Sequence, residues 1–98
     1  MSKNKALNSE EIQTNMQGLT DWTLENDKKL TKAYKFKNFK EALAFTNKVG
    51  EIAEAEKHHP DIQLSYGKVV INQETHEGDG LTEKDFTLAQ KIDQIEMP

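Results

Sequence analysis

Cysteine is absent from the 98 residues of this chain. Disulfides, thiolate nucleophiles and cysteine-ligated zinc sites are therefore excluded. Long apolar runs are absent too, because the longest one, ALAF at residues 42–45, is far shorter than the roughly 20 residues that cross a bilayer. The opening sequence MSKNKALNSEE lacks the apolar core of a secretion signal. We therefore expect a cytoplasmic protein with no membrane partner.

Basic charge is also scarce in this sequence. Lys and Arg number 13 against 17 Asp and Glu, which gives a net charge of −4. Proteins that bind nucleic-acid backbones normally present a basic surface, so this balance argues against a nucleic-acid partner. Apolar residues make up 35% of the chain and charged residues 31%, which is enough for one modest core. Length and composition together predict a single domain over residues 1–98.

Three segments begin with residue types that cap helix N-termini. The caps are Asn8 or Ser9, Asn38 and Thr82. Glu41 and Asp85 follow the last two caps at the spacing of a capping box. An apolar stripe then marks the second helix, at Phe39, Leu43, Thr46, Val49 and Ala53, and Phe45 and Ile52 widen it. These patterns predict helices at the start, middle and end of the chain.

Gly50 interrupts the second helix, where it costs about 1 kcal/mol relative to alanine. We expect a close backbone contact there, with a crossing strand or a partner helix. Pro60 must end this helix, because proline cannot continue it and the residue before proline is pushed out of the α region. On this basis His58 lies in the last helical turn and His59 lies where the chain leaves it.

Strand patterns fill the remaining segments. They are DWTLEN at residues 21–26, KLTKAYKFK at 29–37 and the hairpin DIQLSYGKVVINQET at 61–75. We place the hairpin turn at Gly67–Lys68, with Gly67 at positive φ. Tyr66 then points into the core, facing Val69, and Leu64 faces Ile71.

The resulting order is α-β-β-α-β-β-α. Two hairpins separated by a long helix predict an α+β fold, a four-stranded antiparallel sheet with three helices packed on one face. We expect the segment VVINQE, at residues 69–74, to form an edge strand that could pair with a second copy.

The adjacent histidines His58 and His59 are the first candidates for chemistry. Both would lie at the negative end of a helix dipole, which favours imidazolium. Glu54 precedes His58 by four residues and would share its face, where a carboxylate can orient an imidazole. Histidine titrates near ~6.5, so each ring can move a proton at neutral pH.

Blander interpretations of these residues stay open at this point. A histidine near a helix C-terminus and a Glu–His pair on a helix are ordinary surface features. Asp85 is expected as a capping residue, and His76 stands alone in the polar loop ETHEGDG. A metal site is disfavoured, because adjacent histidines lack the i, i+3 or i, i+4 spacing that places ligands on one helix face.

The combined spacing of these residues is more specific than any one of them. It reads Glu54, three residues, His58-His59-Pro60, five residues, Tyr66, nine residues, His76, eight residues and Asp85. This pattern resembles the signature of the pterin-4a-carbinolamine dehydratases, also known as the dimerisation cofactor of a hepatocyte nuclear factor. The likeness extends through the Trp22 segment, NFKEALAFTNKVGEIAEAEKHHPDI and THEGDGLTEKDFTLAQKID, so it covers roughly residues 8–95.

The resemblance implies a hydro-lyase of tetrahydrobiopterin recycling. Such an enzyme eliminates water from 4a-hydroxytetrahydrobiopterin, the product of aromatic amino acid hydroxylases, to give quinonoid dihydropterin. The C4a hydroxyl must be protonated as it leaves, and N5–H must lose its proton. A general acid and a general base with pKa values near neutrality suit both steps, so neither a metal nor another cofactor is needed.

The resemblance also implies roles for residues and partners. His58, His59 and His76 would line a pocket around C4a. Glu54 would orient His58 or meet the polar edge of the pterin, and Asp85 would orient His76 while it caps its helix. Trp22 is more often a core residue than a pterin stack in such a setting. The expected partners are the pterin substrate, a second copy in a homodimer or homotetramer, and functionally an aromatic amino acid hydroxylase. The alternative is a non-catalytic interaction module on the same scaffold.

Overall fold

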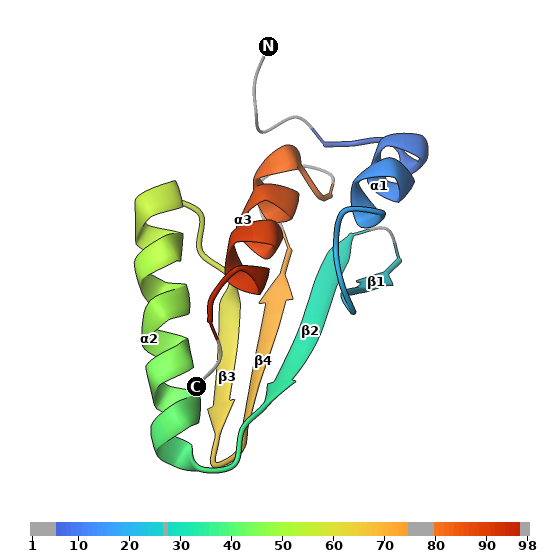
Figure 1. Cartoon of the computed structure of the whole chain (residues 1–98). Helices are drawn as coiled ribbons and strands as arrows, with labels where there is room; N and C mark the ends of the chain where they lie inside the picture. The colour runs from blue at the N-terminus through green and yellow to red at the C-terminus, as the bar shows by residue number, and fades with distance from the viewer. Residues whose placement is uncertain (1–5, 27, 75–79, 97–98) are drawn as a thin grey trace.

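The computed structural model describes residues 6–26, 28–74 and 80–96, and Figure 1 shows how its elements are arranged. The elements in chain order are α1 Ser9–Met16, β1 Thr23–Glu25, β2 Lys29–Lys35, α2 Phe39–Glu56, β3 Asp61–Ser65, β4 Lys68–Gln73 and α3 Glu83–Asp93. The predicted α-β-β-α-β-β-α order and the α+β class are confirmed. No helix within these ranges is long and apolar enough to cross a membrane.

The three helices begin at the predicted capping residues. The Asn8 side chain accepts a hydrogen bond from Glu11 N at 2.8 Å. Asn38 does the same for Glu41 N at 2.9 Å. Thr82 is the N-cap of α3, with the extended backbone of a capping residue. Local hydrogen bonding by short polar side chains therefore fixes all three helix starts.

The sheet is antiparallel throughout, with strand order β1-β2-β4-β3. Strand β4, which includes most of the segment VVINQE, pairs with β2 on one side and β3 on the other. The expectation that this segment forms an edge was therefore wrong. The edges are the three-residue β1 and the five-residue β3.

Helices α2 and α3 lie over the same face of the sheet (Figure 1). The core between them and the sheet contains Leu30, Phe45, Val49, Val69, Ile71, Leu88 and Ile92, all at most 1% exposed. Trp22 is 6% exposed and belongs to this core cluster, in line with its more ordinary interpretation. The buried face of the sheet thus carries the alternating residues of β2 and β4.

The predicted apolar stripe of α2 is confirmed at Phe45, Val49 and Ala53 but not along its whole width. The buried residues are Ala42, Phe45, Val49 and Ala53. Phe39 and Leu43, assigned to the core from their spacing, are 42% and 40% exposed. No crossing strand makes the close contact expected at Gly50, because a Cβ built there meets no atom of the described part of the chain within 4 Å outside its own helical turn.

The β3–β4 turn falls one residue earlier than predicted. Ser65 pairs with Lys68 and Leu64 with Val69, so Tyr66–Gly67 forms the turn and Tyr66 is 69% exposed rather than in the core. Gly67 does not have the positive φ expected of it. It is required by close approach, since a Cβ there would lie 2.9 Å from the carbonyl oxygen of Phe36.

Candidate active site

The C-terminus of α2 sets the course of the histidine segment. The helix ends at Glu56, and Lys57 adopts the left-handed conformation with φ 54° and ψ 39°. His58 N then donates to Ala53 O at 3.1 Å, and Lys57 N donates to Glu54 O at 3.3 Å. This pair of bonds is the Schellman pattern that closes a helix. His58 therefore lies beyond the helix, not in its last turn as predicted.

This early ending changes the partner of Glu54. Residues four apart share a face only while the helix continues. With Lys57 turned into the left-handed region, Glu54 Oε2 meets Nε2 of His59 instead of the His58 ring. His59 and Glu54 are well exposed, with side chains 63% and 77% accessible. The expectation that Glu54 orients His58 was therefore wrong in its choice of histidine.

His58 is instead held by α3. Its Nε2 lies 2.7 Å from Oδ1 of Asp85. The Asp85 side chain is fully buried and that of His58 is 18% exposed. The second carboxylate oxygen of Asp85 accepts a hydrogen bond from Thr82 N at 2.9 Å. One carboxylate thus caps the helix and faces an imidazole at once, as expected, but the imidazole is that of His58.

His76 lies outside the described residues. Its expected place beside His58 and His59, and its expected contact with Asp85, stay predictions. Within the described ranges the site consists of two imidazole–carboxylate pairs. The His58–Asp85 pair is largely buried and the His59–Glu54 pair is exposed.

The buried pair has the clearer chemical consequence. Asp85 lies in the first turn of α3, where the helix dipole and a backbone N–H both stabilise its negative charge. A carboxylate next to Nε2 favours the tautomer with the proton on that nitrogen, which leaves the lone pair of a neutral ring on Nδ1. His58 is therefore oriented to accept a proton at Nδ1, and as imidazolium it can return one.

The described residues contain no group of three or more metal-ligating side chains. Each described histidine has a single carboxylate neighbour, which suits proton transfer. Sequence reasoning missed Lys57, whose backbone conformation redirects both histidines. No sequence signal marks it, because the residue usual at this position is glycine.

A profile of the family described as Pterin 4 alpha carbinolamine dehydratase matches residues 5–95. The chain belongs to this family. A protein of Alkaliphilus metalliredigens (strain QYMF) is 51% identical over 89 residues, which cover 90% of this chain and 80% of that protein. One from Picosynechococcus sp. (strain ATCC 27264 / PCC 7002 / PR-6) is 48% identical, covering 91% and 96%. Both relatives carry the provisional name pterin-4-alpha-carbinolamine dehydratase.

Solved structures also resemble the chain. A transcriptional coactivator/pterin dehydratase from Brucella melitensis superposes with a TM-score of 0.83 at 30% identity, covering 92% of this chain and 96% of that one. A pterin dehydratase-like protein identified as a RuBisCO assembly factor in the alpha-carboxysome gives a TM-score of 0.65 at 20% identity, covering 78% and 89%. The second likeness concerns the fold alone.

Proposed function

We propose that this protein is a 4a-hydroxytetrahydrobiopterin dehydratase that works by histidine general acid–base catalysis. The reaction breaks the C4a–O bond and forms a C4a=N5 double bond. One imidazolium gives its proton to the leaving hydroxyl, which departs as water, and one neutral imidazole accepts the N5 proton. The proton count balances over one turnover, so neither an oxidant nor a metal enters the reaction.

The His58–Asp85 contact is the observation that carries this proposal. A surface histidine at a helix end needs no buried carboxylate. Burying a charged carboxylate is unfavourable unless it is paired and hydrogen-bonded, and Asp85 has both His58 and Thr82 N as partners. We assign His58, His59 and His76 as the proton-transfer groups, Asp85 as the residue that orients His58, and Glu54 as the partner of His59.

The test is a dehydration assay with synthetic 4a-hydroxytetrahydropterin. Replacing His58 or His59 with alanine should lower kcat by about 10²–10⁴-fold, the usual contribution of general acid–base catalysis. Circular dichroism and sedimentation should be unchanged. Lys40→Ala, an exposed change on α2, is the matched control and should retain full rate. Wild-type turnover no faster than buffer would refute the assignment.

A second candidate function is a non-catalytic interaction module. It is favoured by the exposed apolar pair Phe39 and Leu43 on α2 and by the name of the Brucella melitensis structure, a transcriptional coactivator/pterin dehydratase. The dehydration assay separates the two functions. A module of this kind would lose partner binding on Phe39→Ser or Leu43→Ser, whereas a dehydratase would lose turnover on His58→Ala.

We also propose that the protein forms a homodimer or homotetramer. Strand β3, Asp61–Ser65, is the sheet edge available to a second copy. An antiparallel pair centred on Gln63 would set Ile62 against Leu64 of the other copy and Asp61 against Ser65, so no like charges would face each other. Gln63→Pro should reduce the sedimenting mass, because proline removes a backbone donor from the edge.

A further inference from the structure

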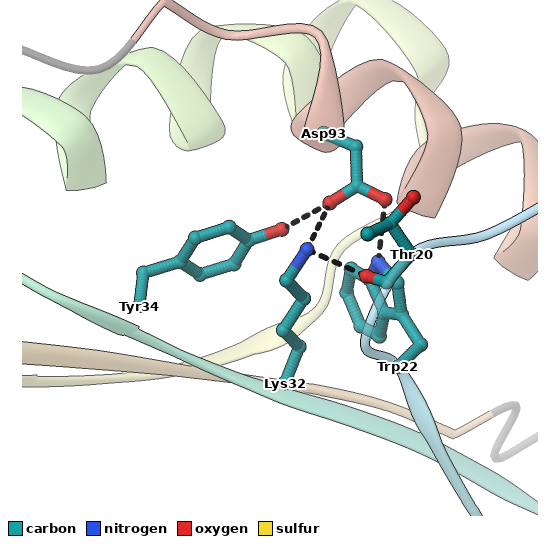
Figure 2. Close-up of polar contacts among 5 residues, drawn as sticks. All are labelled: Thr20, Trp22, Lys32, Tyr34 and Asp93. Carbon is teal, nitrogen blue, oxygen red and sulfur yellow. Dashed lines mark hydrogen bonds and ion pairs between the residues drawn. The ribbon is translucent and has the colours of Figure 1, made fainter.

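Asp93, the last residue of α3, is the centre of a polar cluster (Figure 2). Its Oδ1 accepts hydrogen bonds from Lys32 Nζ and Tyr34 OH, both at 2.7 Å. Its Oδ2 accepts one from Trp22 Nε1 at 3.0 Å. Lys32 Nζ also donates to the carbonyl oxygen of Thr20 at 2.7 Å. Strand β2 and the segment that precedes β1 therefore meet at one carboxylate of α3.

Local helix energetics do not explain an aspartate at this position. A negative charge in the last turn of a helix is opposed by the helix dipole, and Asp85 already occupies the favourable end. Lys32 and Asp93 also give up most of their hydration, with side chains 13% and 19% exposed. Burial and the neighbouring Asp93 raise the pKa of Tyr34 well above its usual range, so its hydroxyl stays a donor.

The cluster does not use all of its hydrogen-bonding capacity. The Lys32 ammonium, which also lies 4.7 Å from the centre of the Tyr34 ring, has three N–H donors, and the described residues use two of them, through the backbone of Thr20 and the Asp93 carboxylate. The Asp93 carboxylate has about four acceptor positions, of which the cluster uses three. One charged donor and one charged acceptor therefore remain side by side.

Both groups border a cavity. A hollow of about 360 Å³, open to solvent, is lined by Thr20, Lys32, Tyr34, Ile92, Asp93 and Ile95. Its wall is mostly apolar. A mainly apolar concavity of a few hundred Å³ with a few convergent polar groups is the usual form of a small-molecule site.

From this arrangement we infer that the hollow binds a small zwitterion, an α-amino acid with a large apolar side chain. The ligand carboxylate meets the free N–H of Lys32, and its ammonium meets the free acceptor position of Asp93. Its side chain packs against Ile95, which is partly exposed at the rim of the hollow. The ammonium and carboxylate of the ligand are adjacent, as are the Lys32 ammonium and the Asp93 carboxylate. Both protein groups are partly desolvated, and charge-assisted hydrogen bonds are strong in such a setting.

This site is distinct from the candidate active site. Asp85 and Asp93 are eight residues apart on α3, which places their backbones about 12 Å apart along the helix axis. The inference therefore stands independently of the proposed dehydratase activity, and its test requires no turnover.

The test is a titration of the full-length protein with L-leucine, followed by NMR on the indole N–H of Trp22, the only tryptophan. We expect a saturable shift of this signal. N-acetyl-L-leucine lacks the ammonium and L-leucinamide lacks the carboxylate, so each should bind at least about tenfold more weakly. Equal binding of all three compounds, or no saturable shift with L-leucine, would overturn the inference.

Two variants locate the site. Ile95→Trp fills the hollow without touching any of the four hydrogen bonds to Asp93 and Lys32, so it should abolish the shift while thermal stability is kept. Glu96→Gln removes a neighbouring exposed charge and should leave binding unchanged. Binding that survives Ile95→Trp would place the ligand elsewhere and refute the assignment.

Discussion

His58 and Asp85 lie 27 positions apart in the chain, yet Nε2 of the imidazole and Oδ1 of the carboxylate are 2.7 Å apart. The left-handed turn at Lys57 brings His58 out of α2, and the capping geometry of α3 fixes Asp85. The orientation of one side chain is thus set by the end of one helix and the beginning of another. This relationship carries the proposed chemistry.

Asp85→Asn should separate orientation from folding. The amide oxygen of asparagine can still accept the hydrogen bond from Thr82 N, while its NH₂ group would face His58 Nε2. A donor at that position favours the opposite tautomer, with the ring proton on Nδ1. The same substitution at the aspartate of a serine-protease triad lowers kcat about 10⁴-fold, and we expect a loss of about 10²-fold or more in the dehydration assay.

The control for this variant is Glu83→Gln. Glu83 also lies in the first turn of α3 but is exposed, so its loss removes a similar charge without a contact to His58. It should retain turnover within about twofold. Full activity of the Asp85→Asn protein, with native circular dichroism, would show that His58 needs no carboxylate.

Much of the fold could be predicted because it depends on local signals. Asn8, Asn38 and Thr82 start helices through hydrogen bonds to residues two or three positions away, which a sequence displays directly. The hairpin turn was misplaced for a physical reason. The predicted turn pairs Leu64 with Ile71, and the observed turn, one residue earlier, pairs Leu64 with Val69. Both registers pair one apolar residue with another, so the apolar pattern does not distinguish them.

The pairing within the candidate site could not be predicted in the same way. The match of Glu54 to His58 assumed a helix that continues through Lys57. A lysine in the left-handed region carries no sequence signal, since its conformation is stabilised by the hydrogen bonds that close α2. Strand order was equally hidden, because it depends on long-range pairing of β2 with β4.

Alkaline pH should weaken the Asp93 cluster through Tyr34. Its pKa is raised in the folded protein, mainly by burial and then by Asp93, whereas the unfolded chain titrates near ~10. Above pH ~10 the unfolded state therefore loses a proton that the folded state keeps. The free energy of unfolding contributed by this group is complete below pH ~10 and falls as the pH rises further.

Urea unfolding at pH 7 and pH 11 measures this effect. Tyr34→Phe should be less stable than the wild type by about 1 kcal/mol at pH 7, the typical value of one hydrogen bond. This difference in the free energy of unfolding should shrink at pH 11, because only the wild type has a Tyr34 hydroxyl that ionises more easily in the unfolded state. Tyr66→Phe, at an exposed turn, should follow the wild type at both pH values. A constant difference between wild type and Tyr34→Phe would contradict the linkage.

Gly50 and Gly67 should respond to alanine in opposite directions. A Cβ at Gly50 meets no atom of residues 6–26, 28–74 or 80–96 within 4 Å outside its own helical turn, so Gly50→Ala should stabilise the protein by up to about 1 kcal/mol through helix propensity. A Cβ at Gly67 would lie 2.9 Å from the Phe36 carbonyl oxygen. That oxygen belongs to the backbone and cannot move freely, so Gly67→Ala should destabilise. Thermal unfolding of the two variants provides the comparison, and a destabilised Gly50→Ala protein would indicate a neighbour from a second copy.

Gln73 offers a test of how polar burial limits stability. Its side chain is 1% exposed at the end of β4, and neither Nε2 nor Oε1 has a hydrogen-bond partner among the residues that the structure describes. An unpaired buried amide costs about 1–3 kcal/mol, whereas an apolar group of the same length avoids that cost. Gln73→Met should therefore raise the urea midpoint with an unchanged slope. Gln13→Met, at an exposed position of α1, should leave the midpoint where it is. A lower midpoint for Gln73→Met would contradict this prediction. It would mean that a buried water hydrogen-bonds the Gln73 amide in solution, and that the methionine leaves this water without one of its partners.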